Sequence, residues 1–105
     1  MALSEIGIGL IGCGLMGYRH GMAFSTIRGV CVTAVTDLQP TAAQKLAERF
    51  NAVAVPTHQE LLARTDVDAV VIAVSDDAHL VPTLDAIAAR KHILLEKPLA
   101  MSLDE

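Results

Sequence analysis

The chain has 105 residues and a formal net charge of −4, and its composition is 52% hydrophobic but only 3% aromatic. This length suits one domain with one core, and an acidic chain without a basic patch argues against a nucleic-acid partner. Its apolar runs are shorter than the ~18 residues of a membrane span, its N-terminus has no basic signal region, and Cys13 and Cys31 lack metal-ligand spacing. We therefore expect a cytoplasmic protein with reduced cysteines, no metal and no membrane contact.

Strand-like and helix-like segments alternate along the chain with short connections. We expect strands at residues 6–11, 31–36, 52–55, 68–74 and 92–96, and helices at residues 15–27, 40–50 and 78–90. The capping box Thr57-His58-Gln59-Glu60 should start a further short helix that runs through Leu61 and Leu62. The helix at 40–50 should begin at Pro40 and carry an apolar stripe formed by Ala42, Ala43, Leu46, Ala47 and Phe50. Gly29 should stop the first helix, whose core-facing residues we expect to be Met16, Ala23 and Ile27. Such alternation predicts an α/β fold, in which a parallel sheet with right-handed crossovers carries helices on both faces.

The first strand runs directly into Gly12-x-Gly14-x-x-Gly17, and a helix-compatible segment follows. We expect Gly12 to form a tight turn, Gly14 to let the main chain approach a pyrophosphate, and Gly17 to let the helix lie close to the strand. The N-terminus of the helix would then present N–H groups and a partial positive charge to the phosphates. An ordinary strand-to-helix turn is the alternative. The cofactor-binding residues predicted from this stretch are Gly12, Cys13, Gly14, Leu15, Met16 and Gly17.

An acid follows the second strand, as a dinucleotide site requires: Asp37 lies twenty residues after Gly17. Its carboxylate can accept hydrogen bonds from the adenosine ribose and would repel a 2′-phosphate, and Leu38 after it is not basic. NAD is therefore favoured over NADP. The alternative is an aspartate that caps the helix beginning near Pro40. Motif and acid together predict a Rossmann-like doubly wound sheet of five strands in the order 3-2-1-4-5.

A family resemblance rests on three stretches. They are Gly12-Cys13-Gly14-Leu15-Met16-Gly17-Tyr18-Arg19-His20, Asp37, and Glu96-Lys97-Pro98-Leu99-Ala100. Together they resemble the N-terminal domain of the glucose-fructose oxidoreductase / inositol 2-dehydrogenase-like family (Gfo/Idh/MocA), against which the whole chain can be laid almost without gaps. The resemblance implies an NAD(P)-dependent oxidoreductase that moves a hydride between the nicotinamide and a hydroxyl-bearing carbon of a sugar or cyclitol. It also implies a catalytic role for Lys97 beside the nicotinamide, with Glu96 near the cofactor, and we expect a cis Lys97–Pro98 bond.

The chain departs from the family pattern after the fourth strand. Family members commonly have Thr-Pro-Asn there, whereas this chain has Val74-Ser75-Asp76, with the family's histidine kept as His79. An ionised aspartate only accepts hydrogen bonds where an amide can also donate. The resemblance makes Val74, Ser75, Asp76 and His79 cofactor-binding candidates, although His79 could equally cap its helix. We expect His20 to be a packing or helix-surface residue rather than a ligand, and His58 and His92 to lie on the surface without a partner.

Length is the largest departure, because the family has a second domain that carries the substrate pocket. Residues 102–105 form a capping box with no helix after it, so we expect residues 1–105 to be the dinucleotide-binding domain of a longer protein that binds a small polyol or sugar and is a possible homo-oligomer. Alone, this piece should be inactive. A stand-alone, non-enzymatic dinucleotide-binding module is the alternative, and a dihydrodipicolinate-type reductase is disfavoured by Glu96-Lys97-Pro98.

Overall fold

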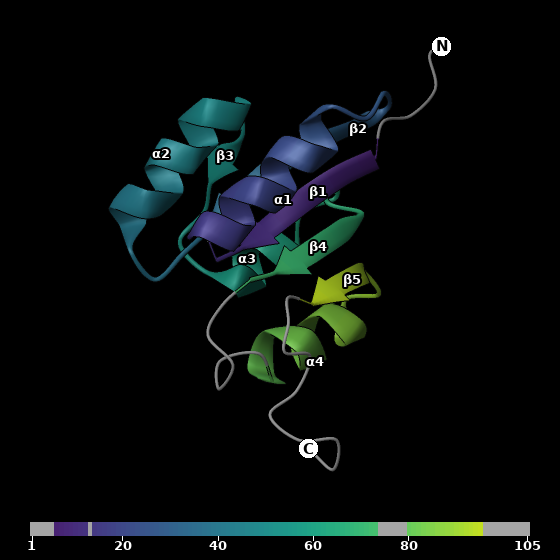
Figure 1. Ribbon diagram of the computed structural model, residues 1–105. Helices are drawn as coiled ribbons and strands as arrows, with labels where there is room; N and C mark the ends of the chain where they lie inside the picture. Colours follow the sequence, from purple (N-terminus) through teal and green to yellow (C-terminus); the bar gives the residue numbers. More distant parts are fainter. Residues whose placement is uncertain (1–5, 13, 74–79, 96–105) are drawn as a thin grey trace.

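The computed structural model describes residues 6–12, 14–73 and 80–95. Five parallel strands form one sheet in the order β3-β2-β1-β4-β5, which confirms the predicted doubly wound order. The strands are β1 (Ile6–Ile11), β2 (Val30–Thr36), β3 (Val53–Ala54), β4 (Ala69–Ile72) and β5 (His92–Leu95). The helices are α1 (Leu15–Ser25), α2 (Pro40–Phe50), α3 (His58–Leu62) and α4 (Leu80–Ala88). Figure 1 shows α1 and α2 side by side, with α4 at the other end of the molecule beside β5.

Two apolar cores, one on each face of the sheet, hold these layers together. Successive strand residues point to opposite faces, so neighbouring residues of one strand enter different cores. The core under α1 and α2 contains Ile8, Leu10, Val32, Val35, Ala43, Leu46, Ala47 and Val71. The core under α3 and α4 contains Ile11, Ala34, Leu61, Leu62, Val67, Val70, Ile72 and Ala86. Burial on both faces explains why the central strands are almost continuously apolar.

The β1–β2 pair contains an irregularity that a strand pattern does not reveal. Ile8 pairs with Val32 but Gly9 pairs with Ala34, so Thr33 is an extra residue on β2. The Thr33 hydroxyl donates to the Asp66 carbonyl at 3.0 Å, which connects this bulge to the turn before β4. Past the bulge, Ile11 pairs with Thr36, so both strands end level at the same edge.

Helix α1 packs on the sheet through Gly17, Gly21 and the partly buried Tyr18 and Phe24, and not through the residues that its sequence predicts. Ala23 is exposed, Ile27 is 49% exposed, and the helix ends at Ser25, so the predicted core face was wrong. Gly17 and Gly21 are buried instead, and a Cβ on Gly21 would lie 2.6 Å from the Phe50 ring. Side chains on this face would hold the helix away from β1, so counting apolar residues identifies the wrong side. The Met16 side chain lies outside the described part.

The second and third helices begin and pack as predicted. Pro40 is the first residue of α2, whose buried residues Ala43, Leu46 and Ala47 belong to the expected stripe. Before α3, Thr57 accepts a hydrogen bond from the Glu60 amide at 3.1 Å, as its capping box requires. No helix in the described ranges is long and apolar enough to cross a membrane. Residues 74–79 and 96–105, with the second capping box and the Lys97–Pro98 bond, lie outside the described residues.

One histidine prediction was wrong. His58 is not an unpartnered surface residue, because its Nε2 lies 2.7 Å from Oδ2 of Asp85 and its side chain is only 18% exposed. The contact joins the start of α3 to α4, two helices that are far apart in sequence. It needs the folded sheet to bring them together, which is why sequence spacing gave no sign of it. His92 is exposed, as expected.

Candidate dinucleotide-binding site

The carboxyl ends of the three central strands meet at one edge of the sheet. The Gly12 amide donates to the Thr36 carbonyl at 2.9 Å, and the Ala73 amide donates to the Ile11 carbonyl at 2.8 Å. The segments that follow β1, β2 and β4 therefore leave the sheet next to one another. In open parallel sheets this edge is where ligands bind, at the point where the strand order reverses.

The glycine turn after β1 has the conformation that its sequence predicts. Gly12 has φ +98°, which an L side chain rarely adopts, so the chain leaves β1 sharply. Gly17 packs so closely on the turn that an added Cβ would collide with the Gly12 carbonyl oxygen. Around Gly14, by contrast, an added Cβ would meet no heavy atom within 4 Å. The side chain missing at Gly14 thus leaves open space in front of the turn.

The first turn of α1 suits an anion. Gly14 is the N-cap residue and has no side chain to accept from the first N–H groups, and the first turn, which includes Leu15 and Met16, contains no acid. Such groups normally need an acceptor, and the helix dipole favours a negative one. The described residues therefore fit a diphosphate at this helix end. Cys13, also predicted here, lies outside the described residues.

Asp37 follows Thr36, the last residue of β2, and so lies beside the turn. Its Oδ1 accepts a hydrogen bond from the Gln39 amide at 2.8 Å, so the capping alternative describes a real contact. The N-cap of α2 is nevertheless Gln39 and not Asp37. Because a carboxylate oxygen can accept more than one hydrogen bond, this contact is compatible with a ribose partner. Leu38, next to it, is 95% exposed.

The remaining predicted site residues follow β4 and β5. Ile72 pairs with Leu95, so these two strands end level at the same edge as the glycine turn. Val74, Ser75, Asp76, His79, Glu96 and Lys97 lie outside the described residues. The register of β4 and β5 thus accounts for where their segments leave the sheet, and the role of each residue stays a prediction.

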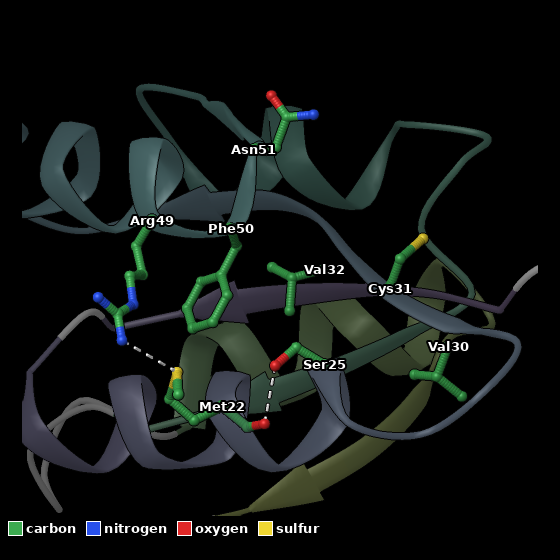
Figure 2. Close-up of a pocket in the computed structure, with 8 residues that line it drawn as sticks. All are labelled: Met22, Ser25, Val30, Cys31, Val32, Arg49, Phe50 and Asn51. Carbon is green, nitrogen blue, oxygen red and sulfur yellow. Dashed lines mark hydrogen bonds between the residues drawn. The ribbon is translucent and has the colours of Figure 1, made fainter.

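A hollow of about 400 Å³ lies elsewhere, at the far end of α1 from the glycine turn (Figure 2). It is lined by Met22, Ser25, Val30, Cys31, Val32, Arg49, Phe50 and Asn51. Arg49 crosses its rim, donating to the Tyr18 hydroxyl at 3.2 Å and contacting the Met22 sulfur at 3.8 Å. Its lining comes from three separate segments, so no sequence pattern could have revealed it. It adjoins the beginning of β2, away from the carboxyl edge, and is not the dinucleotide site.

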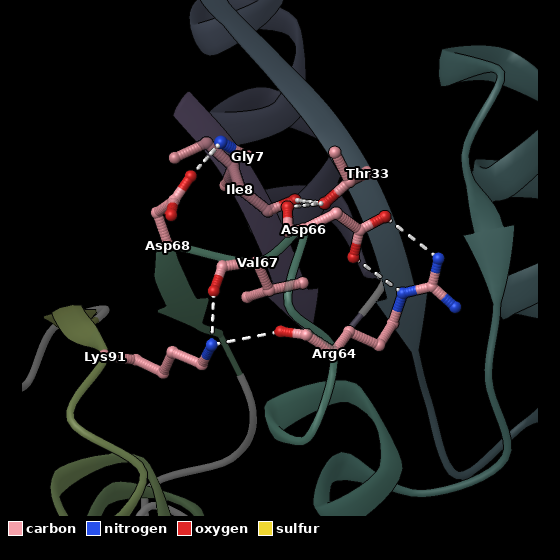
Figure 3. A network of polar contacts seen from close by, with 8 residues as sticks. All are labelled: Gly7, Ile8, Thr33, Arg64, Asp66, Val67, Asp68 and Lys91. Carbon is pink, nitrogen blue, oxygen red and sulfur yellow. Dashed lines mark hydrogen bonds and ion pairs between the residues drawn. The ribbon is translucent and has the colours of Figure 1, made fainter. Parts of the chain in front are cut away.

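A polar network ties down the opposite edge of the sheet (Figure 3). Arg64 donates two hydrogen bonds of 2.9 Å to the Asp66 carboxylate, which lower the pKa of Asp66 and raise that of Arg64. The ammonium of Lys91 donates to the carbonyls of Arg64, at 3.0 Å, and Val67. Asp68 accepts from the Gly7 amide at 2.8 Å. These charged side chains fix the start of β4, far from the glycine turn. Their role is therefore to stabilise the fold and not to bind a ligand.

No cluster of three or more His, Cys, Asp or Glu side chains suited to a metal ion occurs in the described ranges. The part of the chain that the structure covers thus offers one ligand-binding arrangement at the carboxyl edge. It is built from the glycine turn, the first turn of α1 and Asp37.

Comparisons with known proteins agree with this arrangement. A curated inositol 2-dehydrogenase from Acidothermus cellulolyticus is 46% identical over 98 residues, which are 91% of this chain and 29% of that protein. The crystal structure of myo-inositol dehydrogenase from Lactobacillus casei with NAD(H) and myo-inositol superimposes with a TM-score of 0.88 at 36% identity, over 95% of this chain and 30% of that one. A 3-ketoreductase from Actinomadura kijaniata, solved with NADP and TDP-benzene, gives a TM-score of 0.85 at 34% identity, over 92% of this chain and 30% of that one.

The chain therefore spans about 30% of the length of the relatives that it matches. A family model described as "Oxidoreductase family, NAD-binding Rossmann fold" matches residues 6–105, almost the whole chain. The chain thus belongs to the Gfo/Idh/MocA oxidoreductase family, as its NAD-binding Rossmann domain.

Proposed function

We propose that this chain is the nucleotide-binding part of an NAD-dependent dehydrogenase that acts on a hydroxyl-bearing carbon of a cyclitol or sugar. The observation that carries the proposal is the turn at Gly12–Gly17, whose open space at Gly14 and acid-free helix end suit a diphosphate. The relatives named above, an inositol 2-dehydrogenase among them, support the substrate class. A cytoplasmic location belongs to the same proposal, since thiols such as Cys31 stay reduced there.

The residues of this chain would share the work of binding. The first N–H groups of α1 hold the diphosphate, and the Asp37 carboxylate accepts from the ribose hydroxyls and repels a 2′-phosphate. We place Val74, Ser75, Asp76, His79 and Glu96 around the nicotinamide end, because their segments leave the same edge of the sheet. When bound, NAD supplies the acceptor for the hydride.

Lys97 is the residue that we propose as catalytic. It comes two residues after Leu95, the last residue of β5, and so follows the strand out at the edge where the cofactor would lie. A lysine there can hold or donate a proton at the substrate oxygen as the hydride moves. Its ammonium would also orient the hydroxyl by a hydrogen bond. Hydride transfer further requires a substrate held against the nicotinamide, and we assign that task to a second domain because the relatives are about three times as long.

The experiment is a calorimetric titration of NAD and of NADP on the wild type, Asp37→Ala and Asp37→Asn. We expect the wild type to prefer NAD, and both variants to bind NAD about tenfold more weakly because a charge-assisted hydrogen bond is lost. Asp37→Asn is the matched control: its side-chain oxygen can still accept from the Gln39 amide, so it should retain the stability that Asp37→Ala loses. Equal affinity of the wild type for both cofactors would remove the role of Asp37, and absence of NAD binding would overturn the proposal.

A further inference from the structure

The last two residues of α2 hold α1 from the side. Gly21 of α1 is buried, and its missing side chain leaves a notch beside the end of α2. The Phe50 ring fills this notch so closely that an added Cβ on Gly21 would lie 2.6 Å from two of the ring atoms. Figure 2 shows Phe50 reaching from the end of α2 toward α1. A ring seated in a notch resists sliding of α1 past α2, because packed groups leave no free space to move into.

A second contact lies next to the first one. Arg49, which precedes Phe50, donates to the Tyr18 hydroxyl at 3.2 Å, and its guanidinium carbon lies 5.6 Å from the centre of the Tyr18 ring. The same guanidinium lies 3.8 Å from the Met22 sulfur. Tyr18 and Met22 are four residues apart, so Arg49 bridges two successive turns of α1. We call Arg49 and Phe50 the α2 clasp.

The α2 clasp contacts α1 beyond the point where the glycine turn fixes it. The first turn of α1 is held by that turn, because Gly17 packs directly on Gly12. A helix fixed at one end can still tilt, and the contacts further along decide its direction. The free N–H groups of the first turn point along the helix axis. The direction in which they face a diphosphate therefore depends on the α2 clasp.

Helix α2 is also connected to the other proposed anchor of the cofactor. Asp37 accepts from the Gln39 amide at 2.8 Å, and Gln39 is the N-cap of α2. One helix thus contacts Asp37 through its first residues and α1 through its last ones. The separation between the diphosphate site and Asp37 is therefore set by how α1 lies against α2.

We propose that Phe50 and Arg49 are positioning residues for the dinucleotide. Without touching the cofactor, they fix α1 at the angle at which its N–H groups and Asp37 match one NAD molecule. The inference rests on the proposed function, because it requires NAD to span both anchors. A ligand that must satisfy two anchors at once binds best when their separation is preset. Loosening the α2 clasp should therefore weaken NAD binding although both anchors remain.

Calorimetric titration of NAD on the wild type, Phe50→Leu, Asp37→Asn and the double variant tests this. Phe50→Leu keeps an apolar side chain but empties part of the notch, so it should bind NAD about fivefold more weakly. In the Asp37→Asn background the same change should cost less than about twofold, because NAD then has one anchor to satisfy and can follow α1. Two losses that simply multiply would contradict the proposal, since a merely looser fold weakens binding equally in both backgrounds.

Val67→Ala separates positioning from stability. Val67 is 1% exposed and belongs to the core on the other face of the sheet. Its truncation should lower the melting temperature at least as much as Phe50→Leu does, yet leave NAD affinity unchanged. Circular dichroism verifies that each variant is folded at the temperature of the titration. An equal loss of affinity in Val67→Ala and Phe50→Leu would show that general loosening, and not the angle of α1, is the cause.

Arg49→Ala tests the exposed half of the α2 clasp, and it should bind NAD about threefold more weakly. Lys45→Ala is the matched control: Lys45 is exposed one turn earlier on α2, and the variant removes the same positive charge without touching α1. Equal losses in these two variants would mean that charge, and not position, explains the effect of Arg49.

The wild type distinguishes failure of this inference from failure of the proposed function. If the wild type binds NAD and neither Phe50→Leu nor Arg49→Ala weakens binding, the positioning role is wrong and the proposed function stands. If the wild type does not bind NAD, the proposed function is wrong and this inference is wrong with it.

Discussion

Two glycines of one turn are expected to respond differently to the same methyl group. An added Cβ on Gly14 meets open space, so Gly14→Ala should leave thermal unfolding unchanged within about 0.5 kcal/mol. Its methyl would occupy the space proposed for the diphosphate, so NAD affinity should fall by about tenfold. An added Cβ on Gly17 collides with the Gly12 carbonyl, so Gly17→Ala should also destabilise the fold by about 1–3 kcal/mol. Calorimetric NAD titration and thermal melts separate the two effects.

The pair also locates the site. If Gly14→Ala bound NAD as tightly as the wild type, the diphosphate would not lie in front of this turn, whatever Gly17→Ala did. If Gly14→Ala unfolded the chain, the space around Gly14 would be filled in solution.

Arg90 occupies a backbone conformation that favours glycine. It follows α4 with φ +63°, its amide donates to the Ile87 carbonyl at 3.0 Å, and the Lys91 amide donates to the Ala86 carbonyl at 3.1 Å. This is the Schellman arrangement, in which a Cβ on the left-handed residue destabilises the helix end. Arg90→Gly should raise the unfolding free energy by about 0.5–1 kcal/mol, measured by urea denaturation.

Asn51 supplies the comparison for Arg90. It closes α2 in the same way, with φ +55°, but asparagine tolerates this region. Asn51→Gly should therefore change stability little, and an equal gain at both positions would show that backbone strain is not the cause.

At the level of elements, the turn between α3 and β4 should make the stability of the fold depend on pH. Arg64 holds the pKa of Asp66 below its usual value, so the pair stabilises the folded chain above pH ~4 and is lost as pH falls through the lowered pKa. Because the Asp66 side chain is 45% exposed, the contribution should be only about 0.2–1 kcal/mol. Asp66→Asn should lower the melting temperature at neutral pH, and the difference from the wild type should disappear once the pH has fallen below the lowered pKa of Asp66. A difference that persisted at low pH would show that the hydrogen bonds matter without the charge.

The elements themselves were predictable, because each depends on a local signal. The alternation of strand-like and helix-like segments, together with Pro40 at the start of α2 and Thr57 before α3, placed most predicted boundaries within two residues of those in the structure. The predicted face of α1 was wrong, because its closest contacts are made at Gly17 and Gly21, which add no hydrophobicity, and because the side chains that pack against the core are Tyr18 and Phe24. The His58–Asp85 contact was missed because only the folded sheet makes these helices neighbours.

The backbone of the candidate site was about as predictable from the sequence as the helices and strands were. Its glycines each have a backbone requirement that the sequence states directly, and the structure gives Gly12 and Gly17 the geometry expected of them. The hydrogen bond from the Gln39 amide to Asp37 was only one of two alternatives, because an aspartate before a helix can serve a cap, a ligand or both.

At the scale of the whole molecule, binding and turnover should separate. The relatives are about three times as long as this chain, and hydride transfer needs a substrate oriented against the nicotinamide. We therefore expect the 105 residues to bind NAD but to produce no NADH from myo-inositol, measured by absorbance. Robust turnover by these residues would show that no second domain is needed.

Tyr18 gives this molecule a built-in optical reporter. The sequence has one tyrosine and no tryptophan, and that tyrosine follows Gly17 in the first turns of α1. Its ring lies 6.4 Å from that of Phe50 and 5.6 Å from the Arg49 guanidinium, both on α2. Tyrosine fluorescence therefore comes from a single point where α1 meets α2, so unlabelled protein can report any separation of these two helices.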